Sequence, residues 1–129
     1  MTEWSEPAAQ AAEKILAAGG KRPDELDEVE RLALGALMYG ACTALAVRDG
    51  QSDIGVIGTA LTGALSASLG LEKRTAAEYV RFYTRCTERG FHPALYEIIA
   101  RGAALSRCIG EPEALAAIVQ DTLRSTKRK

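Results

Sequence analysis

The chain has 129 residues, of which 47% are hydrophobic, 26% are charged and 5% are aromatic. This length fits one domain, and the apolar fraction with a net charge of −1 excludes a disordered or low-complexity chain. Alanine is the commonest residue and has the highest helix propensity, so the composition favours an all-α fold. We expect a single helical domain over residues 1–129, with frayed ends at 1–6 and 125–129.

Hydrophobic periodicity predicts six helices with short connections, at about residues 7–18, 24–48, 53–69, 75–89, 93–109 and 112–124. Ser5 and Ser52 are expected N-caps, and Thr75 with Glu78 forms an expected capping box. Trp4 is expected to lie against the body of the domain. Short connections favour antiparallel packing of sequence neighbours, so we predict a compact bundle.

The second predicted helix is apolar on almost every side beyond Leu32, which is typical of a central helix. Gly35, Ala36, Gly40 and Ala41 would let other helices approach closely, either inside the core or at a homodimer seam. The weakly charged stretch 32–47 is too short and too mild to predict a membrane span. The N-terminal residues show no signal-peptide pattern, so we expect a cytoplasmic protein.

The cysteines are Cys42, Cys86 and Cys108, and their spacing fits no zinc or redox motif. Each lies in an apolar, helical stretch. We therefore expect them to be buried small hydrophobic residues in a reducing compartment.

Charge is divided unevenly along the chain. Residues 1–64 carry 10 acidic and 5 basic groups, a net of −5, and residues 65–129 carry 7 acidic and 11 basic groups, a net of +4. The acidic excess peaks in a run that opens the second helix: Asp24, Glu25, Asp27, Glu28 and Glu30. Acidic residues stabilise a helix N-terminus, but this run exceeds what capping needs. We predict that it binds a basic site on a protein partner, with a solvated helix start as the alternative.

Arg85 and His92, the only histidine, form a second candidate constellation. Their spacing resembles the Arg–His motif of HEPN-type ribonucleases, in which histidine transfers protons and arginine holds the phosphate. Gly90 and Pro93 interrupt the helix between them, so the alternative is that His92 caps the following helix. A net charge near zero gives no support for bulk nucleic-acid binding.

Two weaker clusters complete the set of candidates. Tyr79, Phe82, Tyr83 and Tyr96 follow helical spacing, which is typical of core and rim residues and also of a binding hot spot. Arg124 and Lys127–Lys129 form a basic tail that is expected to be solvated.

Glycine-rich phosphate loops, nucleophile elbows and zinc motifs are missing from the sequence. We therefore expect no ordinary enzyme, no cofactor and no bound metal.

Residues 32–46 resemble the central helix of the immunity protein 48 family of small bacterial proteins. Tyr39-Gly40-Ala41 and Ala44-Leu45 match two steps in that helix, and Ile98-Ile99-Ala-Arg-Gly102 matches a step in a later helix. Arg107-Cys108-Ile109 stands where the family has a tryptophan. The resemblance spans about residues 30–110 and implies a cytoplasmic protein that binds and neutralises one toxin. A HEPN-like ribonuclease and a dimeric accessory module are the alternatives.

Overall fold

The computed structural model describes residues 5–50, 53–88 and 90–126. Within these ranges the chain forms six α-helices, one 3₁₀ turn and no strand, which confirms the all-α prediction. Trp4 and Ser52 lie outside the described residues, as do 1–3 and 127–129 of the expected frayed ends. The elements are α1 Ser5–Gly19, η1 Pro23–Glu25, α2 Glu28–Arg48, α3 Ile54–Leu69, α4 Lys73–Cys86, α5 Pro93–Leu105 and α6 Pro112–Ser125.

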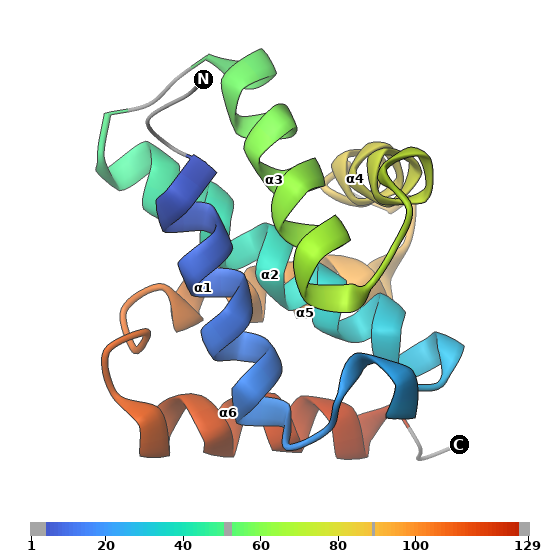
Figure 1. The fold of residues 1–129 in the computed structure, drawn as a ribbon, viewed down its shortest axis with the longest axis vertical. Coiled ribbons are helices and arrows are strands. Elements are labelled where there is room, and N and C mark those ends of the chain that lie inside the picture. Colours follow the sequence, from blue (N-terminus) through green and yellow to red (C-terminus); the bar gives the residue numbers. More distant parts are fainter. Residues whose placement is uncertain (1–4, 51–52, 89, 127–129) are drawn as a thin grey trace.

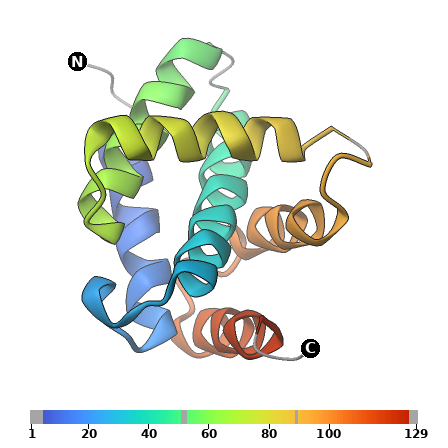
Figure 2. The same cartoon turned by 90° about the vertical axis from the view of Figure 1, so that its right-hand side faces the viewer.

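Helix α2 runs through the middle of the molecule, with the other helices around it (Figures 1 and 2). Helices α1 and α3 lie side by side on one flank, α5 packs on the other, and α6 lies across the lower end. The most extensive contacts join α2 with α5 and α1 with α3, which are not neighbours in sequence. Between α3 and α4 the chain turns by 120°. The expected arrangement of antiparallel sequence neighbours is therefore corrected to one of crossing helices around α2.

The α2–α5 crossing depends on glycines at its closest approach. A methyl group on Gly40 would overlap the carbonyl oxygen of Ile99, and one on Gly102 would overlap the carbonyl oxygen of Leu37. Gly35, Ala36 and Ala41 of α2 are likewise buried within a single chain. Core packing within one chain therefore accounts for the small-residue pattern.

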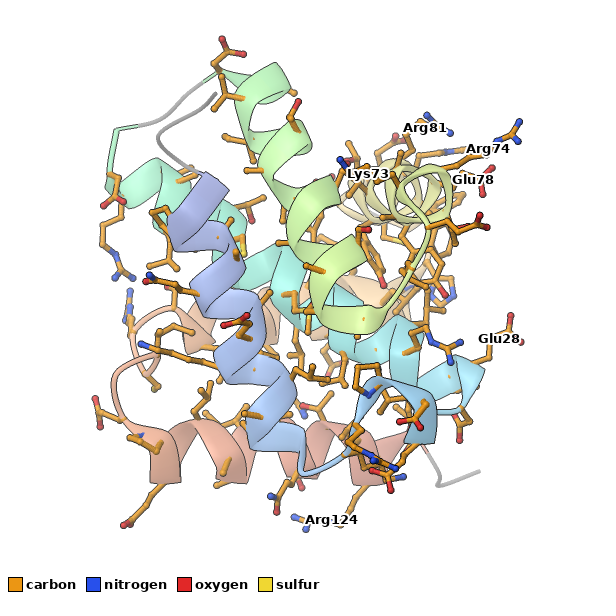
Figure 3. The ribbon with its side chains drawn as sticks, in the orientation of Figure 1. Glu28, Lys73, Arg74, Glu78, Arg81 and Arg124 are labelled. Atoms are coloured by element: carbon orange, nitrogen blue, oxygen red, sulfur yellow. The ribbon has the colours of Figure 1, made fainter. Side chains whose placement is uncertain are left out.

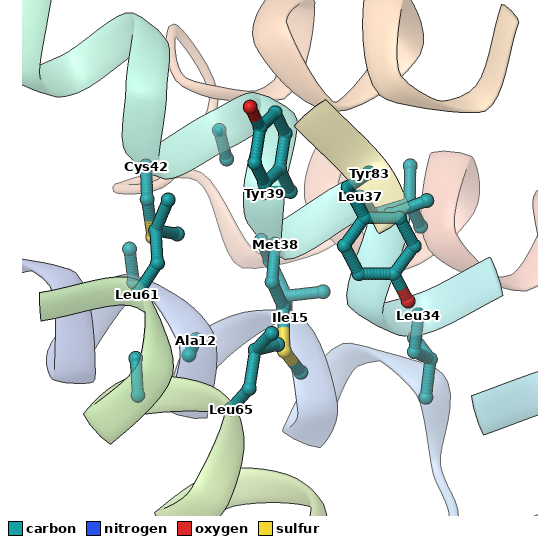
Figure 4. Close-up of a cluster of buried hydrophobic side chains, with 14 of the residues drawn as sticks. Ala12, Ile15, Leu34, Leu37, Met38, Tyr39, Cys42, Leu61, Leu65 and Tyr83 are labelled. Carbon is teal, nitrogen blue, oxygen red and sulfur yellow. The ribbon is translucent and has the colours of Figure 1, made fainter. Parts of the chain in front are cut away.

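Tyr83 of α4 is the largest of the fully buried side chains and ties α4 to α2 (Figure 4). Its hydroxyl donates to the carbonyl oxygen of Leu32 at 2.7 Å, and its ring centroid lies 5.7 Å from that of Tyr39. Burial raises the pKa of Tyr83 well above its usual range, so the phenol remains a neutral donor. The Tyr39 hydroxyl pairs with the Thr84 hydroxyl at 3.0 Å, which makes a second link between the same helices.

The starts of the helices differ from the predictions for local reasons. Residues 23–25 form a separate 3₁₀ turn, and α2 begins later because Asp27 caps it. Helix α4 begins at Lys73, since the amide of Ala76 already bonds the carbonyl of Glu72 at 2.9 Å, so Thr75 is not a capping residue. Asp53 caps α3, and Ser5 lies inside α1 instead of preceding it.

Helix α5 ends at Leu105, four residues before the predicted end near 109. The Ser106 hydroxyl donates to the carbonyl of Ala103 at 2.7 Å, and the guanidinium of Arg48 donates to the same hydroxyl at 2.7 Å. Side-chain bonds of this kind satisfy the last carbonyls of a helix and favour its termination.

By length and composition helix α2 could cross a membrane. The stretch 32–47 alone was predicted to be too short and too mild for a membrane span. However, 67% of the apolar window of α2 is buried inside the fold. A central helix that contacts neighbours on several sides has the same composition.

The three cysteines are expected to differ in reactivity. Cys42 and Cys86 are buried, as predicted, whereas Cys108 is only half-buried. Burial raises the pKa of Cys42 to about 12 and also raises the pKa of Cys86, and the thiolate is the reactive form. We expect an aromatic disulfide reagent at a pH of about 8 to label Cys108 rapidly, and the other two only as fast as the protein unfolds. A fast phase that persists in Cys108→Ser would contradict this.

Candidate partner-binding surface

The acidic residues Asp24–Glu30 lie at the corner where η1 passes into α2. Asp24 and Glu25 belong to η1, and both carboxylates lie near the guanidinium of Arg22, at 3.6 Å and 3.9 Å. The backbone amide of Arg22 also donates to Glu25 Oε1 at 2.8 Å. Because these side chains are at least half exposed, the ion pairs contribute little to stability and leave the carboxylates accessible.

Asp27 and Glu30 form the capping box of α2. Asp27 Oδ1 accepts from the amide of Glu30 at 2.7 Å, and Glu30 Oε1 accepts from the amide of Asp27 at 3.1 Å. Glu30 is only 2% exposed, and its Oε2 accepts from Lys21 Nζ at 2.6 Å. Glu30 therefore has an internal role: it fixes the start of α2 and ties the loop after α1 to it.

Glu28 is another exposed member of the run. It lies in the first turn of α2, and its side chain extends away from the body of the molecule (Figure 3). No partner is found for its carboxylate among the described residues. The structure therefore brings exposed Asp24, Glu25, Asp27 and Glu28 to one corner and encloses Glu30 beneath them.

An apolar groove lies beside this corner, and the sequence did not reveal it. Its volume is about 440 Å³, and its walls come from the start of α2, from α5 and from the end of α6. Val29, which is 56% exposed, stands at its edge next to Glu28, and Leu32 and Ile98 line it. The walls of the groove are far apart in sequence. The one sign of it in the sequence is an apolar residue, Val29, among the charged residues of the first turn of α2.

The polar side of the groove is a network between α5 and α6. Arg101 donates to the Thr122 hydroxyl at 3.1 Å and lies 3.9 Å from Glu97 and 3.5 Å from Asp121. Two carboxylates thus balance the guanidinium of Arg101. The two charged residues that line the groove, Glu97 and Arg101, therefore balance each other, and Glu28 lies beside the groove next to Val29.

Arg85 and His92 both lie in an aromatic cluster between α4 and α5. The Arg85 guanidinium lies 4.5 Å from the ring centroid of Phe91, and the His92 ring meets Phe82 edge-on at 6.1 Å. His92 Nδ1 accepts from the amide of Leu95 at 3.2 Å, so His92 caps α5. In the neutral ring the proton is then on Nε2, which leaves no free lone pair for proton abstraction.

The aromatic residues of α4 and α5 divide between core and surface. Tyr83 is buried, Tyr79 and Phe82 are partly buried, and Tyr96 is 46% exposed. Core and rim packing therefore describes most of this group. Among the described residues, no group of histidine, cysteine or acidic side chains is arranged to hold a metal ion.

Comparison with known protein families identifies the family of this chain. The family model of immunity protein 48 matches residues 5–105, which covers α1 to α5 and more than half of the chain. No curated protein and no solved structure matches it. Immunity proteins protect a cell against a toxin, which indicates a role other than catalysis. The chain therefore belongs to the immunity protein 48 family.

Proposed function

We propose that this protein acts in the bacterial cytoplasm, where it binds its cognate toxin and neutralises it by covering the toxin's active site. Family membership supports the immunity role. The observation that carries the binding mode is the exposed corner of Glu28 and Val29, where unpaired negative charge adjoins an apolar groove. Interfaces combine an apolar centre with a charged edge, as this corner does.

The charge of the corner indicates the kind of toxin surface that it would cover. An active site that binds an anionic substrate is itself basic, and an acidic surface complements it. Asp24, Glu25 and Glu28 are available for this contact, and Asp27 and Glu30 hold the corner in shape. The capping geometry of His92 gives no support to the ribonuclease alternative, so we propose a protein that inhibits without catalysis.

Two experiments test the proposal: protection of a bacterial host against the toxin, and binding of the purified protein to the toxin. Expression of the toxin encoded by the neighbouring reading frame should arrest growth of a bacterial host, and co-expression of this protein should restore growth. The purified protein should form a stoichiometric complex with a catalytically inactive form of that toxin. A toxin that stays fully active in the presence of excess protein would overturn the proposal.

Charge reversal at the corner should slow toxin association. We expect Glu25→Lys with Glu28→Lys to lower the association rate constant about tenfold at low salt, because electrostatic steering depends on the exposed charges. The residual association should also depend less on salt concentration. Stopped-flow fluorescence with the inactive toxin measures both effects.

The matched control changes the same net charge elsewhere. Glu111→Lys with Glu113→Lys alters two exposed acids at the start of α6. If the two double variants associate with the toxin at the same rate, the acidic corner is not part of the interface.

A further inference from the structure

Helix α3 has an exposed face without charge. None of its 16 residues is charged, although Gly55, Thr59 and Gly63 are exposed on one side. Helices at a protein surface normally carry charged residues on the side that faces water. The Thr62 hydroxyl donates to the carbonyl of Gly58 at 2.8 Å, so this polar group is already satisfied within the helix.

The glycines on this face are not required by the fold. A methyl group on Gly58 or Gly63 would meet no atom within 4 Å, and neither residue has a positive φ. Each glycine in a helix interior nevertheless destabilises it by about 1 kcal/mol relative to alanine. Gly40 and Gly102 differ, because neighbouring backbone occupies the space that a side chain would need. A glycine without a neighbour in the folded chain leaves room for the backbone of another molecule.

These residues form one wall of a groove whose other wall is α4. The groove has a volume of about 410 Å³, and Lys73 and Arg81 of α4 are the charged residues that line it. Neither cation has a hydrogen-bond or ion-pair partner among the described residues, and both lie on the same side of the molecule as α3 (Figure 3). Ile54, which is 84% exposed, stands next to Gly55 at one end of the groove.

We infer that the α3–α4 groove binds an acidic helix of the toxin. Small residues on α3 allow a helix axis to approach as closely as about 8 Å, the lower end of ordinary helix packing. Two unpaired cations and no carboxylate in the lining select acidic side chains on that helix. The inference rests on the proposed function, since the toxin is the partner, and it adds a contact surface distinct from the acidic corner.

A membrane surface is the competing occupant, and the composition of the face disfavours it. Helices that lie on membranes bury large side chains such as leucine, phenylalanine or tryptophan. The exposed side of α3 offers mainly glycine and threonine, with Ile54 as its one large apolar residue. This surface suits close packing against a helix better than insertion among lipids.

A bulky side chain in the groove should block the toxin without harming the fold. We expect Gly58→Gln to keep or raise the melting temperature and to raise the Kd for the inactive toxin at least about tenfold, because the new side chain occupies the space of the partner helix. Ala67→Gln is the control, since Ala67 is exposed on the same helix outside the groove lining. An unchanged Kd for Gly58→Gln, with wild-type protein binding the toxin, overturns this inference alone.

Charge reversal gives an independent readout. Lys73→Glu with Arg81→Glu should weaken toxin binding at least about tenfold and reduce its salt dependence, whereas Lys14→Glu on α1 should not. Wild-type protein that fails to bind the toxin overturns the proposed function together with this inference. Wild-type binding to vesicles of phosphatidylcholine and phosphatidylglycerol, lost in Gly58→Gln, identifies the groove as a membrane site and overturns the inference.

Discussion

Gly40→Ala should destabilise the protein by at least about 3 kcal/mol, at the upper end of the range for added core atoms. The added methyl group would meet the carbonyl oxygen of Ile99 and the amide nitrogen of Ala103, both of which are backbone atoms of α5. A side chain can rotate away from an intruding methyl group, but a helix backbone cannot. We expect α2 and α5 to separate and the melting temperature to fall by roughly 10 °C.

Gly63→Ala provides the matched control, because it makes the same chemical change in a helix of the same molecule. Gly63 has no atom within 4 Å of the added methyl group, so helix propensity alone should raise stability by about 1 kcal/mol. Thermal and urea unfolding followed by circular dichroism measure both variants. Equal stability of the two variants would show that the α2–α5 crossing is looser than described.

The fold class was predictable because helix formation leaves local signals in the sequence. Periodic apolar positions and glycine stops identified all six helices, and the apolar second helix is the central one. Helix boundaries were less predictable, since competing caps lie within a few residues of one another. Asp27 starts α2 because its partner Glu30 completes the capping box, whereas Thr75 has a suitable partner in Glu78 but lies inside a helix that has already begun.

The residues that carry the family resemblance are part of the scaffold. Gly40 in Tyr39-Gly40-Ala41 packs against Ile99, and Gly102 at the end of the later motif packs against Leu37. The two motifs therefore meet where α2 crosses α5. A resemblance in these residues identifies the fold and the family, and it carries no information about the surface that meets a toxin.

The acidic run shows why the candidate surface was only partly predictable. Glu28 and Glu30 are two positions apart on a helix, which places their side chains on different faces. One carboxylate points into solvent and the other is enclosed beside Lys21. The adjoining groove could not be found from sequence, because Val29, Ile98 and Thr122 meet only when α2, α5 and α6 pack together.

Tyr83→Phe should partly rescue the damage caused by Gly35→Ala. A methyl group on Gly35 would overlap the Tyr83 hydroxyl and lie 3.0 Å from its ring carbon Cζ, so Gly35→Ala alone should cost about 3 kcal/mol. Tyr83→Phe alone should cost about 1 kcal/mol, because it removes the hydrogen bond to Leu32. The double variant should be more stable than the sum of the two costs predicts, by about 1 kcal/mol or more.

The control for this cycle is Gly40→Ala combined with Tyr83→Phe. The methyl group at position 40 meets the α5 backbone and not the tyrosine, so these two costs should add within about 0.5 kcal/mol. Urea unfolding of the wild type, the three single variants and the two double variants gives both coupling energies on one scale. Simple additivity in the Gly35 cycle would mean that the Tyr83 hydroxyl does not occupy the space above Gly35. The cost of Tyr83→Phe alone would then show how much of the link between α4 and α2 depends on the hydrogen bond to Leu32 and how much on ring packing.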